Sequence, residues 1–232
     1  MQFPSRSGGP PSPNRFTNWQ ARYNPSGAAV IWSLIAANGA VHLLWRSNPR
    51  LASEHFVVSL DSLRQGRYWT AVTAAFSQAD IYHLASNLIT LYFFGSDIGR
   101  IFGGRRLLLL YLAGGVAGSI AHVAHSYYQE RHRQSWRVGP SRVGAMGASA
   151  AVNAIMVVDI LLFPSRTILL YGFIPLPAAL LGLLWLWNDV GGVMTPGSGS
   201  NVAYAGHLGG AAVGLAYYIA FRRGRIRPVG WW

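Results

Sequence analysis

The chain has 232 residues, with 19 basic residues against 7 acidic ones, a formal net charge of +12 and no cysteine. Hydrophobic residues make up 51% of the chain and charged residues only 11%, whereas soluble domains carry roughly 25% charged residues. This composition argues against a soluble enzyme and against a disordered basic protein, and it excludes cysteine-based zinc sites and disulfide scaffolds.

The first segment, residues 1–26, is rich in Pro, Ser, Gly, Asn and Arg, and the first acidic residue of the chain is Glu54. Such a segment cannot bury enough apolar surface to fold alone. Its composition is typical of an organellar transit peptide or its remnant, and a merely disordered tail explains it about as well.

Six apolar stretches follow, each close to the roughly 17 to 25 residues that a membrane-spanning helix needs. They cover residues 27–45, 81–99, 106–125, 147–164, 167–187 and 203–221. The sequence therefore predicts an all-α membrane protein, a bundle of six transmembrane helices over residues 27–222, followed by a basic C-terminal tail over 223–232.

Two longer interruptions separate these stretches. Residues 46–80 have the mixed polar and apolar pattern of a segment lying on the membrane surface, and residues 126–146 form a polar loop. In the fifth stretch, Pro175 and Pro177 remove backbone donors, so we expect that helix to be kinked or broken.

Arginines are unevenly divided between the two sides of such a bundle. The tails and the short loops at 100–106 and 166 share one side, and this side holds 11 of the 19 arginines. Short arginine-bearing loops usually remain on the cytosolic or matrix side, so we expect both termini to face that side.

Polar side chains within the apolar stretches are the candidate functional residues, because polar groups are costly in a membrane. His83 and Asn87 are four residues apart and therefore lie on one helical face. Ser149 and His207 fall, like His83, in the first turns of an even-numbered span. Because even-numbered spans run in the same direction, we expect these groups to converge near one face of the membrane.

Small residues allow the helices that carry these groups to approach closely. Gly206, Gly210 and Gly214 form a stripe along one face, and Ala150 and Ala154 offer a matching face on the fourth span. A direct hydrogen bond between Ser149 and His207 requires such an approach. Taken singly, the serine can bond to its own backbone, the histidine can be a packing residue, and the glycines can serve packing alone.

Three motifs together resemble the rhomboid family of intramembrane serine proteases: HLASN at 83–87, GASA at 147–150 and GHLGGAAVG at 206–214. The resemblance covers roughly residues 56–222, and it is closest to the rhomboids of plant and algal organelles, especially the mitochondrial type. It implies that Ser149 is the nucleophile and His207 the general base of a two-residue dyad, without an acidic third member and without a metal or cofactor. His83, Asn87 and the Ser149 backbone N–H would stabilise the oxyanion, and Gly147, Gly206, Gly210 and Gly214 would allow close packing at the dyad.

Two positions depart from the family pattern. Ala150 stands where the family usually has glycine, and its methyl group either pushes His207 away or fills a slightly wider gap. Asn153 stands where many bacterial members have an aromatic ring, and it is a candidate to orient His207 by hydrogen bonding.

The segment 188–204 has the Gly, Ser and Pro content of a mobile cap, and the broken fifth span beside it is either a lateral gate or a structural kink. The resemblance implies that the substrates are single-span membrane proteins, cleaved near a small residue where the helix unwinds. The alternative function is an inactive rhomboid-like protein that binds or escorts membrane clients.

Two other classes of protein fit the sequence less well. A transporter would carry charges along the interior of its spans, and a nucleic-acid-binding protein would gather its arginines into one patch. The partners that we expect are therefore the lipid bilayer and membrane-protein substrates, and no nucleic acid. The mitochondrial inner membrane is the expected location, with a plastid membrane as the alternative, and the sequence leaves the oligomeric state open.

Overall fold

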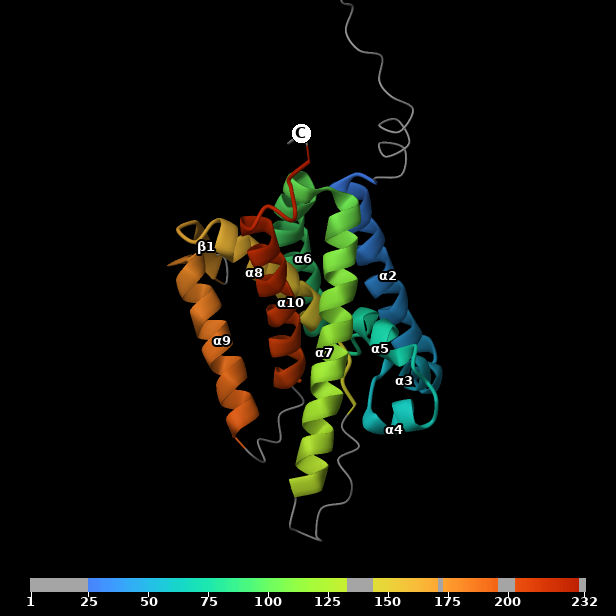
Figure 1. The fold of residues 1–232 in the computed structure, drawn as a ribbon. Coiled ribbons are helices and arrows are strands. Elements are labelled where there is room, and N and C mark those ends of the chain that lie inside the picture. The colour runs from blue at the N-terminus through green and yellow to red at the C-terminus, as the bar shows by residue number, and fades with distance from the viewer. Residues whose placement is uncertain (1–24, 133–143, 171–172, 196–202, 230–232) are drawn as a thin grey trace, which may run out of the picture.

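The computed structural model describes residues 25–132, 144–170, 173–195 and 203–229. These residues form a mostly helical bundle (Figure 1). The long helices are α2 (Gly27–Ser47), α6 (Ile81–Phe102), α7 (Gly104–His132), α8 (Ser149–Leu162), α9 (Ala178–Met194) and α10 (Tyr204–Arg222). Residues 1–24, which carry most of the predicted tail, lie outside the described part.

Between α2 and α6 the chain forms short helices, in the region predicted to lie on the membrane surface. They are α3 (Pro49–Phe56), α4 (Leu60–Arg64), α5 (Thr70–Thr73) and the 3-10 helix η1 (Ala74–Phe76). Ser59 begins α4 with a capping box, in which its hydroxyl and that of Ser62 each accept a hydrogen bond from the other's backbone N–H. The prediction of a polar loop at 126–146 is wrong for its first residues, because α7 continues to His132. Residues 133–143 lie outside the described part.

Length and hydropathy mark α2 and α7, among the described helices, as long and apolar enough to cross a membrane. The apolar helices α8 and α9 are shorter, with 14 and 17 residues. In α6 and α10, which are long enough, the polar groups and glycines of the predicted site reduce the hydropathy. These criteria therefore leave the count of six spans a prediction.

The prediction of a fifth span over 167–187 is wrong at its start. Residues 167–177 form an antiparallel hairpin of β1 (Thr167–Leu170) and β2 (Ile174–Pro177), and α9 begins only at Ala178. Pro175 and Pro177 lie in the extended strand, and Pro177 is the N-cap of α9, so neither kinks a helix. A proline with its fixed φ fits a helix start far better than a helix interior.

The predicted cap at 188–204 is also corrected in part. Residues 188–194 continue α9 in regular helical structure, and residues 196–202 lie outside the described ranges. Pro175 and Pro177 thus come before α9 rather than within it, and α9 is continuous from Ala178 to Met194.

Helix α8 lies at the centre of the bundle and contacts α6, α7, α9 and α10. Most of its side chains are buried, including Ala151, Ala154, Ile155 and Val158. A short helix enclosed in this way is held in place on several sides, so a side chain at its first residue has a defined position.

A buried polar network fastens α2 to the rest of the bundle. Asn38, which is fully buried, donates a 2.8 Å hydrogen bond to the Leu34 carbonyl and a 3.0 Å bond to the Tyr111 hydroxyl, which in turn donates to the Ala75 carbonyl. The Gln78 amide donates to the Asn38 side-chain oxygen at 3.0 Å. Buried polar groups are tolerated when they are paired, and this network fixes η1 next to the segment that precedes Ser149.

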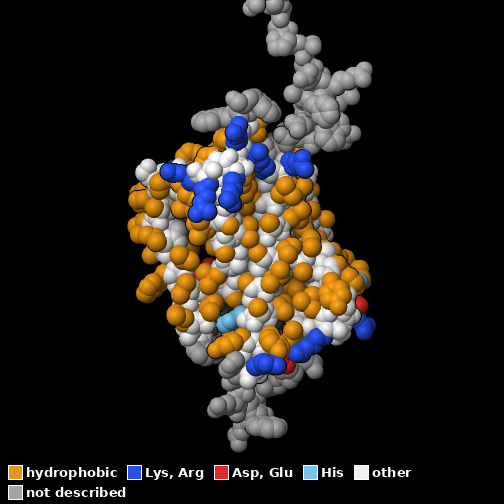
Figure 2. Space-filling model, viewed as in Figure 1, with side chains coloured by type: hydrophobic (Ala, Val, Ile, Leu, Met, Phe, Trp, Pro, Cys, Tyr) orange, Lys and Arg blue, Asp and Glu red, His pale blue; other side chains and the backbone are white. Residues whose placement is uncertain are grey.

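Charge is distributed unequally between the two ends of the bundle. The end where α6 and α10 finish and α7 begins, here called the arginine end, has eight arginines and two aspartates among the described residues: Arg100, Arg105, Arg106, Arg166, Arg222, Arg223, Arg225 and Arg227, with Asp97 and Asp159. Figure 2 shows basic side chains gathered at this end of the molecule, above a wide apolar surface. The short loops and the described part of the C-terminal tail thus share one end, as the sequence predicts.

Candidate active site

Ser149 is the first residue of α8, so its backbone N–H has no partner within the helix. The segment before it is held by a β-bridge between Ala145 and Val58 and by a 3.0 Å hydrogen bond from the Gly147 N–H to the Ala74 carbonyl. Gly147 has φ +141°, a conformation that side chains disfavour, and a Cβ at this position would lie 3.0 Å from Cε1 of His83. Glycine at 147 therefore lets the chain turn tightly into α8 beside the His83 ring.

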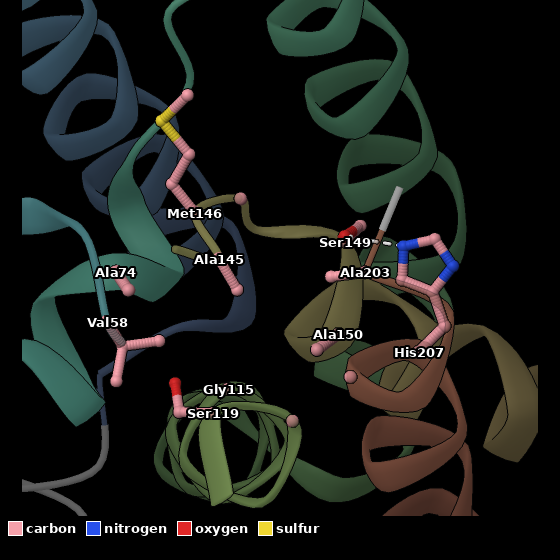
Figure 3. Close-up of a pocket in the computed structure, with 13 residues that line it drawn as sticks. Val58, Ala74, Gly115, Ser119, Ala145, Met146, Ser149, Ala150, Ala203 and His207 are labelled. Atoms are coloured by element: carbon pink, nitrogen blue, oxygen red, sulfur yellow. Dashed lines mark hydrogen bonds between the residues drawn. The ribbon is translucent and has the colours of Figure 1, made fainter. Parts of the chain in front are cut away.

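The structure brings Ser149 and His207 together. The Ser149 Oγ lies 2.9 Å from Nε2 of His207, which comes from the first turn of α10 (Figure 3). This is the distance expected of a nucleophile and its general base. Since the two groups are 58 residues apart in the chain, their contact depends on how α8 and α10 pack.

Glycines of α10 allow that packing. A Cβ on Gly210 would lie 2.0 Å from the Ala150 carbonyl oxygen, and a Cβ on Gly214 would lie 2.4 Å from the Ala154 carbonyl oxygen. Gly206 lies against the backbone of Gly118 in α7. The predicted stripe on α10 is thus in direct contact with backbone of α8 and α7, as close approach between membrane helices requires.

The methyl group of Ala150 is directed toward α7. A Cβ on Gly118 would lie 2.3 Å from the Ala150 Cβ, whereas a Cβ on Gly210 would lie 2.0 Å from the Ala150 carbonyl oxygen. Ala150 does not displace His207, because the histidine keeps its 2.9 Å contact with Ser149. The methyl group instead fills space against Gly118 of α7.

The two predicted oxyanion donors lie on one face of α6. The His83 ring is next to Gly147, and a Cβ on that glycine would in turn lie 3.5 Å from the Ser149 Oγ. Asn87 is 7% exposed, and its amide nitrogen is buried without a hydrogen-bond partner. Such a donor costs free energy in the folded protein, and donors left unpaired at a site are suited to an oxyanion that forms only during a reaction.

A small pocket beside the serine opens to solvent, with about 300 Å³ of space between its walls when the solvent at its mouth is included. Glycines, alanines and serines form most of its wall, with Val58, Met146 and His207 completing it (Figure 3). The residues that line it are Val58, Ala74, Gly115, Gly118, Ser119, Ala145, Met146, Gly147, Ser149, Ala150, Ala203, Gly206 and His207. Its size suits a water molecule or a small side chain.

A match to the Rhomboid domain family model covers residues 65–224, which include His83, Asn87, Ser149 and His207. This chain belongs to the rhomboid family. Rhomboids are membrane proteins, and the family includes serine proteases.

Curated relatives of this rhomboid come from organelles and from bacteria. It is 43% identical to "RHOMBOID-like protein 12, mitochondrial" of Arabidopsis thaliana, over 85% of this chain and 60% of the relative. It is 28% identical to the Arabidopsis "Rhomboid-like protein 16, chloroplastic", over 90% of this chain and 66% of the relative. A shorter match, 39% identical over 28% of this chain and 13% of the relative, joins it to "Rhomboid protease GluP" of Bacillus subtilis. The chain thus spans about three fifths to two thirds of the length of its two plant relatives.

Asp189 is the site residue that the sequence analysis of this rhomboid missed. Its Oδ1 lies 3.0 Å from Nδ1 of His207, and its side chain is 10% exposed. Asn153 was the candidate for orienting His207, but both ring nitrogens of the histidine already contact other residues. Helices α9 and α10 are consecutive and antiparallel, so the end of α9 lies beside the start of α10. An acidic residue near the end of α9, such as Asp189, is therefore a candidate neighbour of His207.

Groups of His, Asp and Glu that could hold a metal ion are absent from the described residues. The side chains and backbone at the site supply a hydroxyl, an imidazole, a carboxylate and a set of N–H donors. This combination can activate a serine for attack on a carbonyl carbon.

Proposed function

We propose that this rhomboid is an intramembrane serine endopeptidase that cleaves transmembrane or juxtamembrane segments of single-span membrane proteins. The observation that carries the proposal is the 2.9 Å contact between the Ser149 hydroxyl and Nε2 of His207. A packing histidine or a serine bonded to its own backbone would not need this contact, since neither requires the other side chain.

In the proposed reaction, His207 accepts the Ser149 proton while the Ser149 Oγ attacks the peptide carbonyl carbon. The resulting oxyanion is stabilised by the Ser149 backbone N–H, the Asn87 amide and the His83 ring. His207 then passes the proton to the departing amine, which leaves an acyl ester on Ser149. A water molecule activated by His207 hydrolyses this ester and frees the serine.

The length of α8 supports a reaction below the membrane surface. Its 14 residues extend about 21 Å at about 1.5 Å per residue, whereas the hydrocarbon core of a bilayer is about 30 Å thick. Arg166 follows α8 at the arginine end, and arginine belongs near the headgroups. Ser149, at the other end of α8, therefore lies inside the hydrocarbon thickness, several ångströms short of the opposite surface.

The pocket beside Ser149 supports a small residue at the cleavage position. Its wall consists largely of glycine, alanine and serine, and it offers space for a methyl or hydroxymethyl group. A bulky side chain would have to displace Met146 or the backbone of α7. Peptide bonds next to alanine, glycine or serine are thus the proposed targets.

The proposed location is the mitochondrial inner membrane, with a plastid membrane as the alternative, in line with the mitochondrial and chloroplastic relatives. By the positive-inside tendency, the arginine end faces the matrix or stroma. The start of α8, and with it the site, then opens toward the opposite compartment.

The test is to incubate the purified full chain, and the Ser149→Ala variant, with a generic transmembrane-segment substrate in detergent and with a fluorophosphonate probe. We expect wild type to cleave the substrate and to be labelled, and Ser149→Ala to do neither while keeping the same melting temperature. A folded wild-type protein that neither cleaves nor is labelled contradicts the proposal and favours an inactive, client-binding rhomboid.

A further inference from the structure

Asp189 contacts the edge of the His207 ring that is turned away from the serine. Its Oδ1 is 3.0 Å from Nδ1, while Nε2 is 2.9 Å from the Ser149 Oγ. We infer that Asp189 is a positioning residue that extends the Ser149–His207 pair into a three-residue relay drawn from α8, α10 and α9. The inference rests on the proposed endopeptidase function.

The first argument concerns the position of the proton on the imidazole ring. A carboxylate only accepts hydrogen bonds, so the Nδ1 atom beside it carries the hydrogen. A neutral ring with its proton on Nδ1 has a lone pair on Nε2, directed at the Ser149 hydroxyl. Asp189 thus selects the one neutral form of His207 that can accept the serine proton.

The second argument concerns charge during the reaction. When His207 takes the serine proton it becomes an imidazolium, in a part of the bundle where water screens charge poorly. The Asp189 carboxylate, at 3.0 Å, compensates that positive charge. The other aspartate on a central helix, Asp159, is paired with Arg166 at the arginine end and serves no such purpose.

The third argument concerns the cost of burying Asp189. On α9 the buried residues are Ala178, Leu181 and Asp189, while Leu183, Trp187 and Met194 are largely exposed. A buried carboxylate without an arginine or lysine partner is a poor source of stability. Within the described ranges, the hydrogen-bond and ion-pair partner of Asp189 is His207. The role of the buried carboxylate is therefore to position that histidine rather than to stabilise the fold.

The fourth argument is that backbone packing places α9 where the relay requires it. A Cβ on Gly192 would lie 2.3 Å from the Tyr204 ring, so this ring packs directly on the α9 backbone one turn after Asp189. Tyr204 and His207 are both in the first turn of α10, with ring centroids 6.5 Å apart. The contact between the two helices therefore sits beside the Asp189–His207 hydrogen bond.

The experiment compares wild type with Asp189→Asn, Asp189→Ala and Asp189→Glu in the full chain, using the generic transmembrane-segment substrate. We expect Asp189→Asn to lower kcat by about 10²–10⁴-fold with KM within about twofold of wild type, because an amide can donate to Nδ1 and favour the unproductive tautomer. Asp189→Glu should recover at least about tenfold of that loss, since it restores the carboxylate.

Two matched controls separate this role from a structural one. Asp159→Asn removes another buried carboxylate, and Asn188→Ala alters the exposed neighbour of Asp189 on the same helix. We expect both to keep kcat within about threefold of wild type. A loss of kcat in Asp159→Asn as large as that in Asp189→Asn overturns the relay.

A spectroscopic measurement on wild type keeps the inference testable if the variants fail to fold. Nitrogen-15 NMR of histidine-labelled protein, with the His207 signals assigned by their loss in His207→Gln, should show the neutral ring protonated at Nδ1. A ring protonated at Nε2 overturns the inference. Asp189→Asn with wild-type kcat also overturns it but leaves the endopeptidase function intact, whereas an inactive wild type rejects the endopeptidase function itself.

Discussion

The arginine end and the end that holds Ser149 are stabilised by different interactions. At the arginine end, Arg166 binds Asp97 at 2.7 Å and Asp159 at 3.2 Å, and the Phe102 ring packs edge-on against Tyr217 and Phe221. Around Ser149 the contacts are between glycines, alanines and backbone carbonyls. Large rings and ion pairs fill space and fix one end, while small residues leave room for a pocket at the other.

The balance of charge differs in the same way. In the half that contains the site, five arginines face five acidic residues in the described ranges: Arg46, Arg50, Arg64, Arg67 and Arg131, with Glu54, Asp61, Asp80, Glu130 and Asp189. The excess of described positive charge is therefore confined to the arginine end. The arginines that would set the proposed orientation and the residues of the proposed chemistry thus lie in separate parts of the molecule, and we expect substitutions to affect one without the other.

Among the predictions that compare these two ends, the largest effect is expected at Asn87, the predicted oxyanion donor whose amide has no hydrogen-bond partner. Asn87→Ala removes an amide that has no partner in the folded protein, so we expect kcat to fall about 10²–10³-fold while the melting temperature stays equal or rises. Cleavage kinetics and thermal unfolding in the same detergent measure both quantities. Thr90→Ala, on an exposed part of the same helix, is the control and should leave kcat unchanged. A parallel loss of stability in Asn87→Ala would show that the amide is structural.

A second prediction concerns the glycine contact between α8 and α10. Gly210→Ala places a methyl group 2.0 Å from the Ala150 carbonyl oxygen, so the helices must separate and the Ser149–His207 hydrogen bond lengthens. We expect at least about tenfold slower fluorophosphonate labelling of Ser149, together with a lower melting temperature. Gly39→Ala is the matched control, because a Cβ there contacts nothing within 4 Å. Unchanged labelling in Gly210→Ala would mean that the helices can part without moving the dyad.

The third prediction separates stability from activity at the arginine end. Arg166→Gln leaves Asp159, which is 1% exposed, without its cation, so we expect the free energy of unfolding to fall by about 2–4 kcal/mol. Thermal unfolding measures this loss, and kcat well below the melting temperature should remain within about threefold of wild type. Adding Asp159→Asn should recover much of the stability. A loss of kcat in a fully folded Arg166→Gln protein would contradict the separation of the two ends.

The smallest effect is expected at a neighbouring arginine with the same aspartate partner. Arg100 lies 3.6 Å from Asp97, but its side chain is 80% exposed, so water screens the pair. We expect Arg100→Gln to change the free energy of unfolding by less than about 0.5 kcal/mol and kcat not at all. The same thermal scan as for Arg166→Gln checks this, and equal destabilisation by the two variants would show that burial does not decide the strength of these pairs.

Helical periodicity and alternating span direction account for what the sequence could predict about the site. His83 and Asn87 share a face because they are four residues apart, and Ser149 and His207 meet because they begin helices that run in the same direction. These rules need only the order of the spans and the position of each residue along its helix. They do not give the rotation of each helix about its own axis. For this reason the sequence could not predict which neighbouring helix the Ala150 methyl group faces.

The fifth span shows where such rules fail. A short apolar run such as 167–177 fits a strand as well as a helix, and hydropathy does not distinguish the two. With the start of α9 displaced, residues 188–204 were interpreted as a loop, and Asp189 was placed outside the helix that in fact carries it. A carboxylate that contacts His207 through the packing of two helices leaves no local pattern in the sequence.

The burial of Asp189 on an otherwise largely exposed stretch of α9 has an evolutionary consequence. If one hydrogen bond both seats this helix and supports the general base, a mutation that lets α9 move more freely also weakens catalysis. Variants with a loosened α9 would then turn over each substrate more slowly. Selection for broader specificity would have to act elsewhere, on the pocket wall or on the exposed apolar side of the helix.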